Sequence, residues 1–154
     1  MKISRATARH VDALVRLMTR SPLLRRYKMT TRRARAGLAE ALRERDLLLV
    51  ARDGAEVVGM AWVVNTRALD RSAYLRLLLV AEGGQSRGVG AALLAEAERR
   101  VRAAGSRHLL FLVTADNRRA RSFYEERGYE RVGALRRFVR PTIDESLYVK
   151  SWRR

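Results

Sequence analysis

Cysteine is absent from this chain of 154 residues, and there are only two histidines and two prolines. Without cysteine there can be no disulfide framework, no thiolate zinc site and no cysteine nucleophile. No apolar run approaches the roughly 20 residues that a membrane-spanning helix needs. The N-terminal stretch MKISRATARH has no signal-peptide core. We therefore expect a cytoplasmic protein with no membrane partner, forming a single domain over residues 1–154.

Acidic residues are also scarce, with 16 against 33 basic residues and a formal net charge of +17. Only Lys2, Lys28 and Lys150 are lysines, so the other basic residues are all arginine. Such a charge favours either a polyanionic partner, such as nucleic acid or a phosphorylated cofactor, or arginines spread over solvated faces. Because the arginines scatter along the whole chain, we favour the second interpretation, and a nucleic-acid partner stays open.

Hydrophobic periodicity predicts alternating helices and strands in the N-terminal half. A short strand near residues 3–5 precedes a helix that begins at VDALVRLM and breaks at Ser21-Pro22. The following elements are a helix capped by Thr31 and running to about residue 44, strands 47–51 and 57–64 joined at Asp53-Gly54, and strand 73–80. The last of these is apolar throughout, which is typical of a strand buried on both faces in the middle of a sheet.

The C-terminal half continues with a glycine-rich turn and a long helix. This helix buries a stripe of five residues and stops at Gly105; the stripe consists of Val89, Leu93, Leu94, Ala97 and Val101. HLLFLV is the next strand, residues 117–126 form a short helix ended by Gly128, and YERVGAL and ESLYVKSW supply two final strands. The order β-α-α-β-β-β-α-β-α-β-β predicts an α+β fold with a mixed sheet.

The turn lies within VAEGGQSRGVGAALL, residues 80–94, where four glycines fall within eight residues. A strand, a glycine-rich turn and a helix N-terminus together form an anion site, because the first N–H groups of a helix have no partner inside it. Gly88 and Gly90 remove side chains that would keep a phosphate away. The stretch matches neither the Walker motif nor a dinucleotide fingerprint. The alternative is a tight turn that binds no ligand.

Two motifs carry a family resemblance. QSRGVG, from Gln85 to Gly90, fits the signature [RQ]-x-x-G-x-[GA] of the GCN5-related N-acetyltransferases, and NRRARSFYEERGY, from Asn117 to Tyr129, resembles their second signature. The resemblance is close from Tyr74 onward and extends to the N-terminal half in element order only. It implies a mixed, mostly antiparallel sheet of about seven strands, flanked by about four helices and splayed at the central strands.

The resemblance also implies a cofactor, acetyl-coenzyme A, which acts as the acetyl donor, and no metal. Its pyrophosphate would be bound by N–H groups of the turn, and the residues concerned are Gln85, Ser86, Arg87, Gly88, Val89, Gly90 and Ala91. Its pantetheine arm would pair with the end of the central strand, at Leu78, Leu79 and Val80. Asn117 would cap its helix and also touch the pantetheine arm. Tyr124 would touch the cofactor as well. Arg119, with Arg87, Arg118 and Arg121, could meet the cofactor's other phosphate.

The implied reaction moves acetyl to a primary amine of a small molecule, peptide or protein by direct attack in a ternary complex. Tyr124 would be the general acid that protonates the leaving thiolate; a core tyrosine is the alternative. Many family members carry a glutamate on the central strand as the base, but here that stretch holds Arg76 and no acid. Glu82 is the candidate base, and a water chain to a backbone carbonyl is equally open. Asp144 and Glu145, expected in the last β–β connection, would attract a cationic acceptor.

Two other functions stay open. A noncatalytic acetyl-coenzyme A sensor would keep the glycine turn and lack the base, whereas retention of Tyr124 favours the enzyme. An RNA-binding or ribosome-binding protein would make the positive charge the main feature. A homodimer is compatible with both the enzyme and the sensor.

Overall fold

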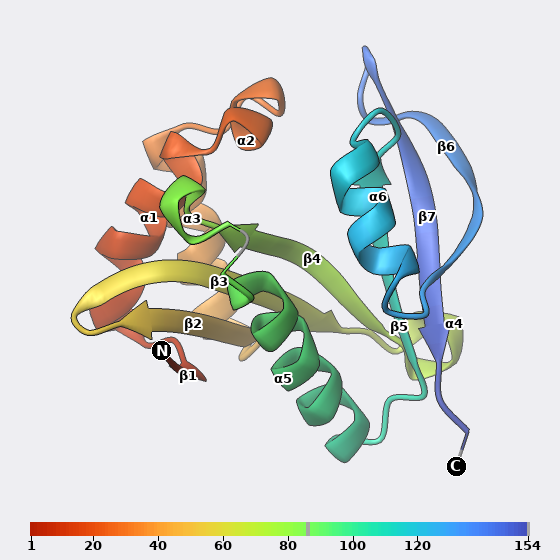
Figure 1. Cartoon of the computed structure of the whole chain (residues 1–154), viewed down its shortest axis with the longest axis horizontal. Helices are drawn as coiled ribbons and strands as arrows, with labels where there is room; N and C mark the ends of the chain where they lie inside the picture. Colours follow the sequence, from red (N-terminus) through yellow and green to blue (C-terminus); the bar gives the residue numbers. More distant parts are fainter. Residues whose placement is uncertain (86, 154) are drawn as a thin grey trace. The chain divides into compact units, whose positions relative to one another are not determined.

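The computed structural model describes residues 1–85 and 87–153 (Figure 1). Its strands are β1 (Lys2–Arg5), β2 (Leu47–Asp53), β3 (Glu56–Asn65), β4 (Ala73–Val80), β5 (His108–Thr114), β6 (Glu130–Arg140) and β7 (Ile143–Ser151). Its α-helices are α1 (Val11–Arg20), α2 (Pro22–Arg26), α3 (Thr31–Arg43), α4 (Ala68–Arg71), α5 (Val89–Ala103) and α6 (Arg118–Glu125). Two 3₁₀ turns are η1 (Ala8–His10) and η2 (Glu82–Gly84).

The strands form one seven-stranded sheet in the order β1-β2-β3-β4-β5-β7-β6. Strands β4 and β5 run parallel, whereas β1–β2, β2–β3, β5–β7 and β6–β7 are antiparallel pairs. The mixed, mostly antiparallel sheet predicted from the sequence is therefore confirmed. The register of β4 with β5 pairs Ala73 with Leu109 and Tyr74 with Leu110. The predicted separation of the central strands, β4 and β5, beyond these residues stays a prediction.

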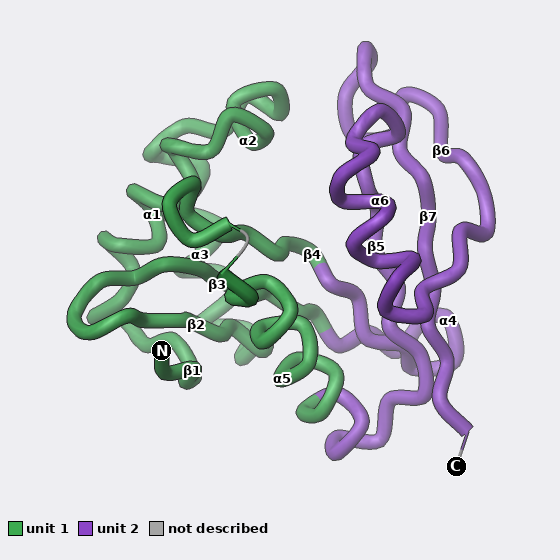
Figure 2. Tube along the Cα trace, viewed as in Figure 1, with its two compact units in different colours: residues 1–64, 76–100 green, residues 65–75, 101–154 purple. Residues whose placement is uncertain are grey.

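The chain divides into two compact units (Figure 2). Unit 1 comprises residues 1–64 and 76–100, and unit 2 comprises residues 65–75 and 101–154. Strand β4 therefore contributes its first three residues to unit 2 and the remainder to unit 1. Each unit has its own set of buried side chains.

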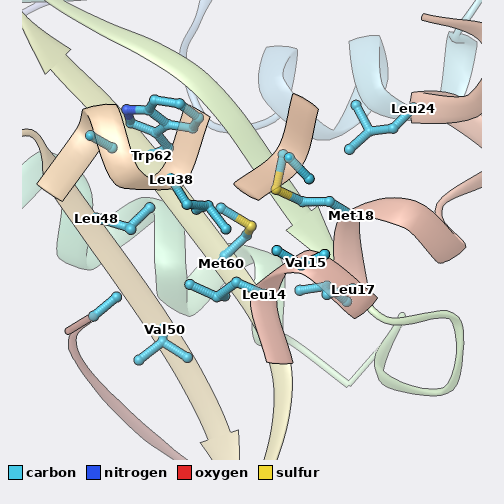
Figure 3. Packing of buried hydrophobic residues seen from close by; sticks show 13 residues of the cluster. Leu14, Val15, Leu17, Met18, Leu24, Leu38, Leu48, Val50, Met60 and Trp62 are labelled. Carbon is cyan, nitrogen blue, oxygen red and sulfur yellow. The ribbon is translucent and has the colours of Figure 1, made fainter. Parts of the chain in front are cut away.

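The buried residues of unit 1 follow from the alternation of side chains along β3. Met60 and Trp62 point to one face, where they join buried residues of α1 and α3 (Figure 3). Gly59 points to the opposite face, where a Cβ would lie 2.9 Å from Leu93 Cδ1 and 3.0 Å from Val89 Cγ1 of α5. Period-two alternation thus packs α1 and α3 on one side of β3 and α5 on the other.

The close approach at Gly59 makes a stability prediction. Gly59→Ala would place its Cβ against two α5 side chains and 3.1 Å from the Leu79 carbonyl oxygen. We expect the overpacking to lower the free energy of unfolding by about 1–3 kcal/mol, measured by urea denaturation. Gly133→Ala on β6 is the matched control, because its Cβ would meet nothing within 4 Å among residues 1–85 and 87–153. Equal stability of the two variants would contradict the packing described.

Aromatic rings form the centre of unit 2. The ring centroid of Phe111 on β5 lies 4.1 Å from that of Tyr124, 4.8 Å from that of Tyr129 and 5.7 Å from that of Tyr148. Phe111 and Tyr148 are directly opposite each other in the β5–β7 register, and their rings are stacked. This cluster packs α6 onto the strands of unit 2.

The structure corrects several local predictions in the N-terminal half. Thr30, rather than Thr31, caps α3, because its side chain accepts a hydrogen bond from the Arg33 backbone N–H. The first helix ends before Ser21-Pro22 as predicted, but another helix follows at once. Ser21 caps the additional short helix α2, where Pro22 occupies the first turn.

Two predictions about strands also needed correction. Strand β4 has the predicted bounds, but only Ala73 and Leu75 are fully buried, and its later residues are half-buried or, at Arg76, exposed. The last two strands are longer than predicted, with β6 ending at Arg140 and β7 beginning at Ile143. Asp144 and Glu145 therefore lie on β7 and not in the connection. Cross-strand pairing to β5 and β6 extends the strand past the polar residues that suggested a loop.

Candidate anion site and acyl-transfer residues

The predicted strand, glycine turn and helix are present in unit 1. The turn after β4 is fixed to β3, because the Ala81 backbone N–H donates to the Val58 carbonyl at 2.9 Å. The N–H of Gly84 then donates to the Ala81 carbonyl at 2.8 Å, which closes η2. At the other end of the turn, Val89 is buried and its side chain lies beside Gly59. One end of the turn is thus held to β3 by a backbone hydrogen bond, and the other by the packing of Val89 beside Gly59.

Three backbone N–H groups stand before the first hydrogen bond of the α5 ladder. The Ala92 N–H donates to the Gly88 carbonyl at 3.0 Å, so the helical ladder of α5 begins at Gly88. The N–H groups of Val89, Gly90 and Ala91 precede this bond and have no acceptor inside the helix by their position. Together with the partial positive charge of the helix terminus, they form the geometry that binds phosphate.

The earlier N–H groups of the turn have other partners. Those of Gln85 and Arg87 donate to the carbonyls of Glu82 and Gly84, at 3.4 Å and 3.3 Å. The N–H groups left as candidate phosphate donors are therefore those at the helix end of the turn, Val89, Gly90 and Ala91. Ser86, which belongs to the same prediction, lies outside the described residues.

Gly88 has the backbone conformation that requires glycine. Its φ is +78°, in the left-handed region, and a Cβ there would meet no atom of the described residues within 4 Å. The glycine is therefore needed for backbone conformation and not to relieve crowding in the protein itself. The open space beside Gly88 and the three donors of α5 fit the pyrophosphate of a coenzyme A molecule.

The arginines assigned to the cofactor's other phosphate differ in their environments. Arg87 forms an exposed ion pair with Asp53, with 3.2 Å between its Nη2 and the carboxylate. Arg118 and Arg119 are exposed at the start of α6. Arg121 instead supports the fold, because its Nε donates to the Tyr148 hydroxyl at 3.2 Å and its Nη1 to the Ala115 carbonyl at 3.3 Å.

The helix α6 positions Tyr124 in the aromatic cluster of unit 2. As predicted, Asn117 caps this helix, with its Oδ1 accepting the Ala120 N–H at 3.1 Å. The Tyr124 side chain is 8% exposed, and its ring packs on Phe111. Burial alone raises the pKa of the Tyr124 hydroxyl above its ordinary value. The hydroxyl is therefore protonated throughout the working pH range.

Arg76, at the strand position where the resemblance implies a glutamate base, has a structural partner. The guanidinium carbon of Arg76 lies 4.7 Å from the centroid of the Trp62 ring, within cation–π range. Trp62 in turn donates from Nε1 to Asp46 at 2.7 Å. Glu82, the candidate base, is exposed on η2.

The residues assigned to the acceptor lie side by side on β7 but in different environments. Asp144 is exposed and accepts the Arg137 backbone N–H at 3.0 Å. Glu145 is 2% exposed and pairs with Thr114 in the β5–β7 register. Alternation along β7 accounts for this difference, because neighbouring side chains point to opposite faces.

One polar network was missed by the sequence analysis. The buried Tyr148 on β7 donates from its hydroxyl to Glu125 Oε1 at 2.6 Å, and it also accepts the Arg121 bond. Arg121 and Glu125 stand four residues apart on α6, a spacing that places them on one face and was visible in the sequence. Their shared partner, Tyr148, could not be predicted from this spacing, because it lies on a strand more than 20 residues away.

A family model described as "Acetyltransferase (GNAT) family" matches residues 12–129. The chain therefore belongs to the GNAT family of acetyltransferases. The match includes residues of both units and reaches further toward the N-terminus than the two motifs do.

Solved structures share the fold over nearly the whole chain. Ribosomal-protein-alanine N-acetyltransferase from Brucella melitensis has a TM-score of 0.80 at 23% identity, covering 99% of this chain and 100% of that chain. An aminoglycoside 6′-N-acetyltransferase complexed with coenzyme A has a TM-score of 0.83 at 17% identity, covering 98% and 97%. PaiA N-acetyltransferase from Thermoplasma acidophilum, in complex with coenzyme A, gives 0.78 at 16% identity, covering 98% of both chains.

Among curated proteins, no sequence matches the chain. Within residues 1–85 and 87–153, no helix has the length and apolar character to cross a membrane. Across the same described residues, no group of three or more histidine, aspartate or glutamate side chains is arranged to hold a metal ion.

Proposed function

We propose that this acetyltransferase moves the acetyl group of acetyl-coenzyme A to a primary amine of a small molecule, peptide or protein, by direct attack in a ternary complex. The observation that carries the proposal is the N-terminus of α5, where the N–H groups of Val89, Gly90 and Ala91 precede the first helical bond beside the left-handed Gly88. Two structures of the same fold contain coenzyme A. That molecule carries the anionic pyrophosphate that this geometry suits.

The α5 donors and the end of β4 would orient the bound donor molecule. Acetyl-coenzyme A supplies an activated thioester, whose carbonyl carbon the neutral amine attacks. The new C–N bond replaces the C–S bond, and the sulfur leaves as a thiolate. The Tyr124 hydroxyl is the proton or hydrogen-bond donor for that sulfur. Because burial raises its pKa, Tyr124 is a weaker acid than an ordinary tyrosine, and its hydrogen bond to the thiolate carries more of the stabilisation.

The attacking amine must lose a proton. Arg76 cannot accept it, so the proposal assigns this step to Glu82 or to a water chain that ends on a backbone carbonyl. Glu82 lies directly after β4, and its exposure would allow it to pass the proton to solvent. Glu82→Gln separates the two routes: a kcat lowered about tenfold or more supports the glutamate, and an unchanged kcat supports the water chain.

The raised pKa of Tyr124 predicts the pH dependence of the reaction. A lysine-like acceptor has a pKa near 10.4, so its reactive neutral fraction grows as the pH rises. Tyr124 stays protonated past the ordinary tyrosine pKa of about 10. We therefore expect kcat/KM to rise steadily between about pH 6 and pH 10, without an alkaline fall. A fall centred below pH 9 that disappears in Tyr124→Phe would contradict the proposed role.

The acids on β7 would attract a cationic acceptor in a protein of strong positive charge. We expect Asp144→Asn combined with Glu145→Gln to raise the KM for a cationic amine and to leave the KM for acetyl-coenzyme A nearly unchanged. Because Glu145 is buried, Asp144→Asn alone is the cleaner arm, and thermal melting of both variants controls for damage to the fold. Equal parameters in parent and variants would place the acceptor elsewhere.

Thiol release from acetyl-coenzyme A, measured against a panel of amines, peptides and aminoglycosides, tests the proposed function. Release that depends on the amine and matches the amount of N-acetyl product supports the enzyme. The absence of acid at the strand position that holds Arg76 favours the competing function, a noncatalytic sensor. Tight coenzyme A binding with no amine-dependent release would establish that sensor instead.

A further inference from the structure

Tyr124 belongs to a helix that needs external support. Helix α6 has only eight residues, about two turns, and such a helix is marginal by itself. Its N-terminus is fixed by the Asn117 cap. A cap fixes where a helix begins, but the direction in which a side chain further along points also depends on the rotation of the helix about its axis. Contacts along the helix must therefore set the position of the Tyr124 hydroxyl.

The Tyr148 hydroxyl makes two such contacts. It donates to Glu125 Oε1 at 2.6 Å and accepts from Arg121 Nε at 3.2 Å. At 3.6 residues per turn, Arg121 and Glu125 are separated by about 40° around α6, and Tyr124 lies about 60° from Arg121. One hydroxyl thus holds two adjacent positions of the helix, directly beside the face that carries Tyr124.

The ring of Tyr148 supports the same tyrosine through the core. It is 0% exposed and stacks on Phe111 at an interplanar angle of 7°. Phe111 also packs on Tyr124, at 4.1 Å between ring centroids. Tyr148 itself is fixed, because it lies on β7, which pairs with β5 on one side and β6 on the other.

We propose that Tyr148 is a positioning residue for Tyr124, acting through its hydroxyl bonds to Arg121 and Glu125, which set the rotation of α6. This inference rests on the proposed function, in which Tyr124 faces the leaving sulfur. The two hydrogen bonds and the stacked ring together fix Tyr124 from the helix surface and from the core.

Tyr148→Phe tests the inference because it removes the hydroxyl and keeps the stacked ring. We expect kcat for acetyl transfer to fall about tenfold, since a small misplacement of a catalytic group is enough for such a loss. The KM for acetyl-coenzyme A should stay within about twofold of the parent value, because the α5 donors are unchanged. A kcat equal to that of the parent would overturn the inference.

A double-mutant cycle with Tyr124→Phe separates positioning from general damage. If Tyr148 acts through the Tyr124 hydroxyl, adding Tyr148→Phe to Tyr124→Phe lowers kcat no further. A merely structural role predicts that the two losses multiply, and that result would overturn the inference. If Tyr124→Phe alone leaves kcat unchanged, the proposed role of Tyr124 fails as well, and this arm identifies that case.

A matched control removes a different bond to the same helix. Arg127 Nη1 donates to the Phe123 carbonyl at 2.7 Å, and its guanidinium carbon lies 3.8 Å from the Phe123 ring centroid. Arg127→Gln therefore loosens the end of α6 without touching the Tyr148 bonds. We expect its kcat to stay close to that of the parent. An equal loss in Arg127→Gln and Tyr148→Phe would show general loosening and overturn the specific role.

A measurement without substrate completes the test. In protein labelled with ¹³C at the tyrosine ring Cζ, we expect Tyr148→Phe to shift or broaden the Tyr124 resonance in the free protein. Arg127→Gln should leave that resonance at its parent position. An unmoved Tyr124 resonance in Tyr148→Phe would overturn the inference, whatever the activity of the variant.

Discussion

Gly88→Val is expected to weaken coenzyme A binding by about 100-fold or more while the protein remains folded. Gly88 has φ +78°, a conformation that a β-branched residue strongly disfavours. A valine would distort the backbone that begins α5 and place methyl groups in the open space assigned to the pyrophosphate. Loss of two or three charge-assisted hydrogen bonds, each contributing about 1.5–3 kcal/mol, accounts for the expected size of the effect. Isothermal titration calorimetry with coenzyme A measures it.

Gly105→Val is the matched control for this variant. Gly105 follows the other end of α5 and has φ +94°, and in the part of the chain that the structure describes its Cβ would also meet nothing within 4 Å. The two substitutions carry a similar backbone strain, so both should lower the melting temperature by a similar amount. Only Gly88→Val should lose coenzyme A. Similar affinities in the two variants would mean that the turn before α5 does not hold the ligand.

Tyr124→Phe is expected to lower the rate constant of acetyl transfer by about 10²-fold or more. The KM for acetyl-coenzyme A should stay near the parent value, because the ring remains packed on Phe111. Burial is the single cause of the raised Tyr124 pKa, so removing the hydroxyl exchanges a buried polar group for an apolar one. The melting temperature should therefore hold or rise while the activity falls.

A single-turnover experiment measures this effect most cleanly, because it isolates the chemical step from product release. The comparison is made at saturating acetyl-coenzyme A and acceptor, with the parent protein beside the variant. A single-turnover rate constant equal to that of the parent would remove Tyr124 from the chemistry and leave it as a core tyrosine.

Local patterns in the sequence were sufficient for most of the fold. The stripe from Val89 to Val101 is buried as predicted, because helical periodicity reports the face that packs on the sheet. The left-handed glycines at 88, 105 and 128 fall at the predicted turns. The N-terminus of α5 was predictable for the same reason, since an apolar strand, glycines and a helical stripe are all contiguous in the chain.

Contacts between distant segments account for what the sequence did not predict. Asp144 and Glu145 were predicted to lie in a polar connection. In the structure β7 extends through them, because Glu145 pairs with Thr114 and Leu135. The sequence suggested that Arg121 could bind a phosphate, whereas in the structure it donates to the Tyr148 hydroxyl and to the Ala115 carbonyl. Gly59 gave no signal at all, because its importance comes from α5 side chains that pack on it. Each of these depends on a partner far away in the chain.

An NMR titration of the ¹⁵N-labelled protein with coenzyme A tests most directly whether the N-terminus of α5 binds the pyrophosphate. The N–H groups of Gly88, Val89, Gly90 and Ala91 report on an anion at the start of α5. We predict that these four amide resonances shift downfield together and saturate with the same dissociation constant. Pantetheine, which lacks the pyrophosphate, should leave them in place. Saturable binding of coenzyme A that moves amides elsewhere and leaves these four unchanged would contradict pyrophosphate binding at the start of α5.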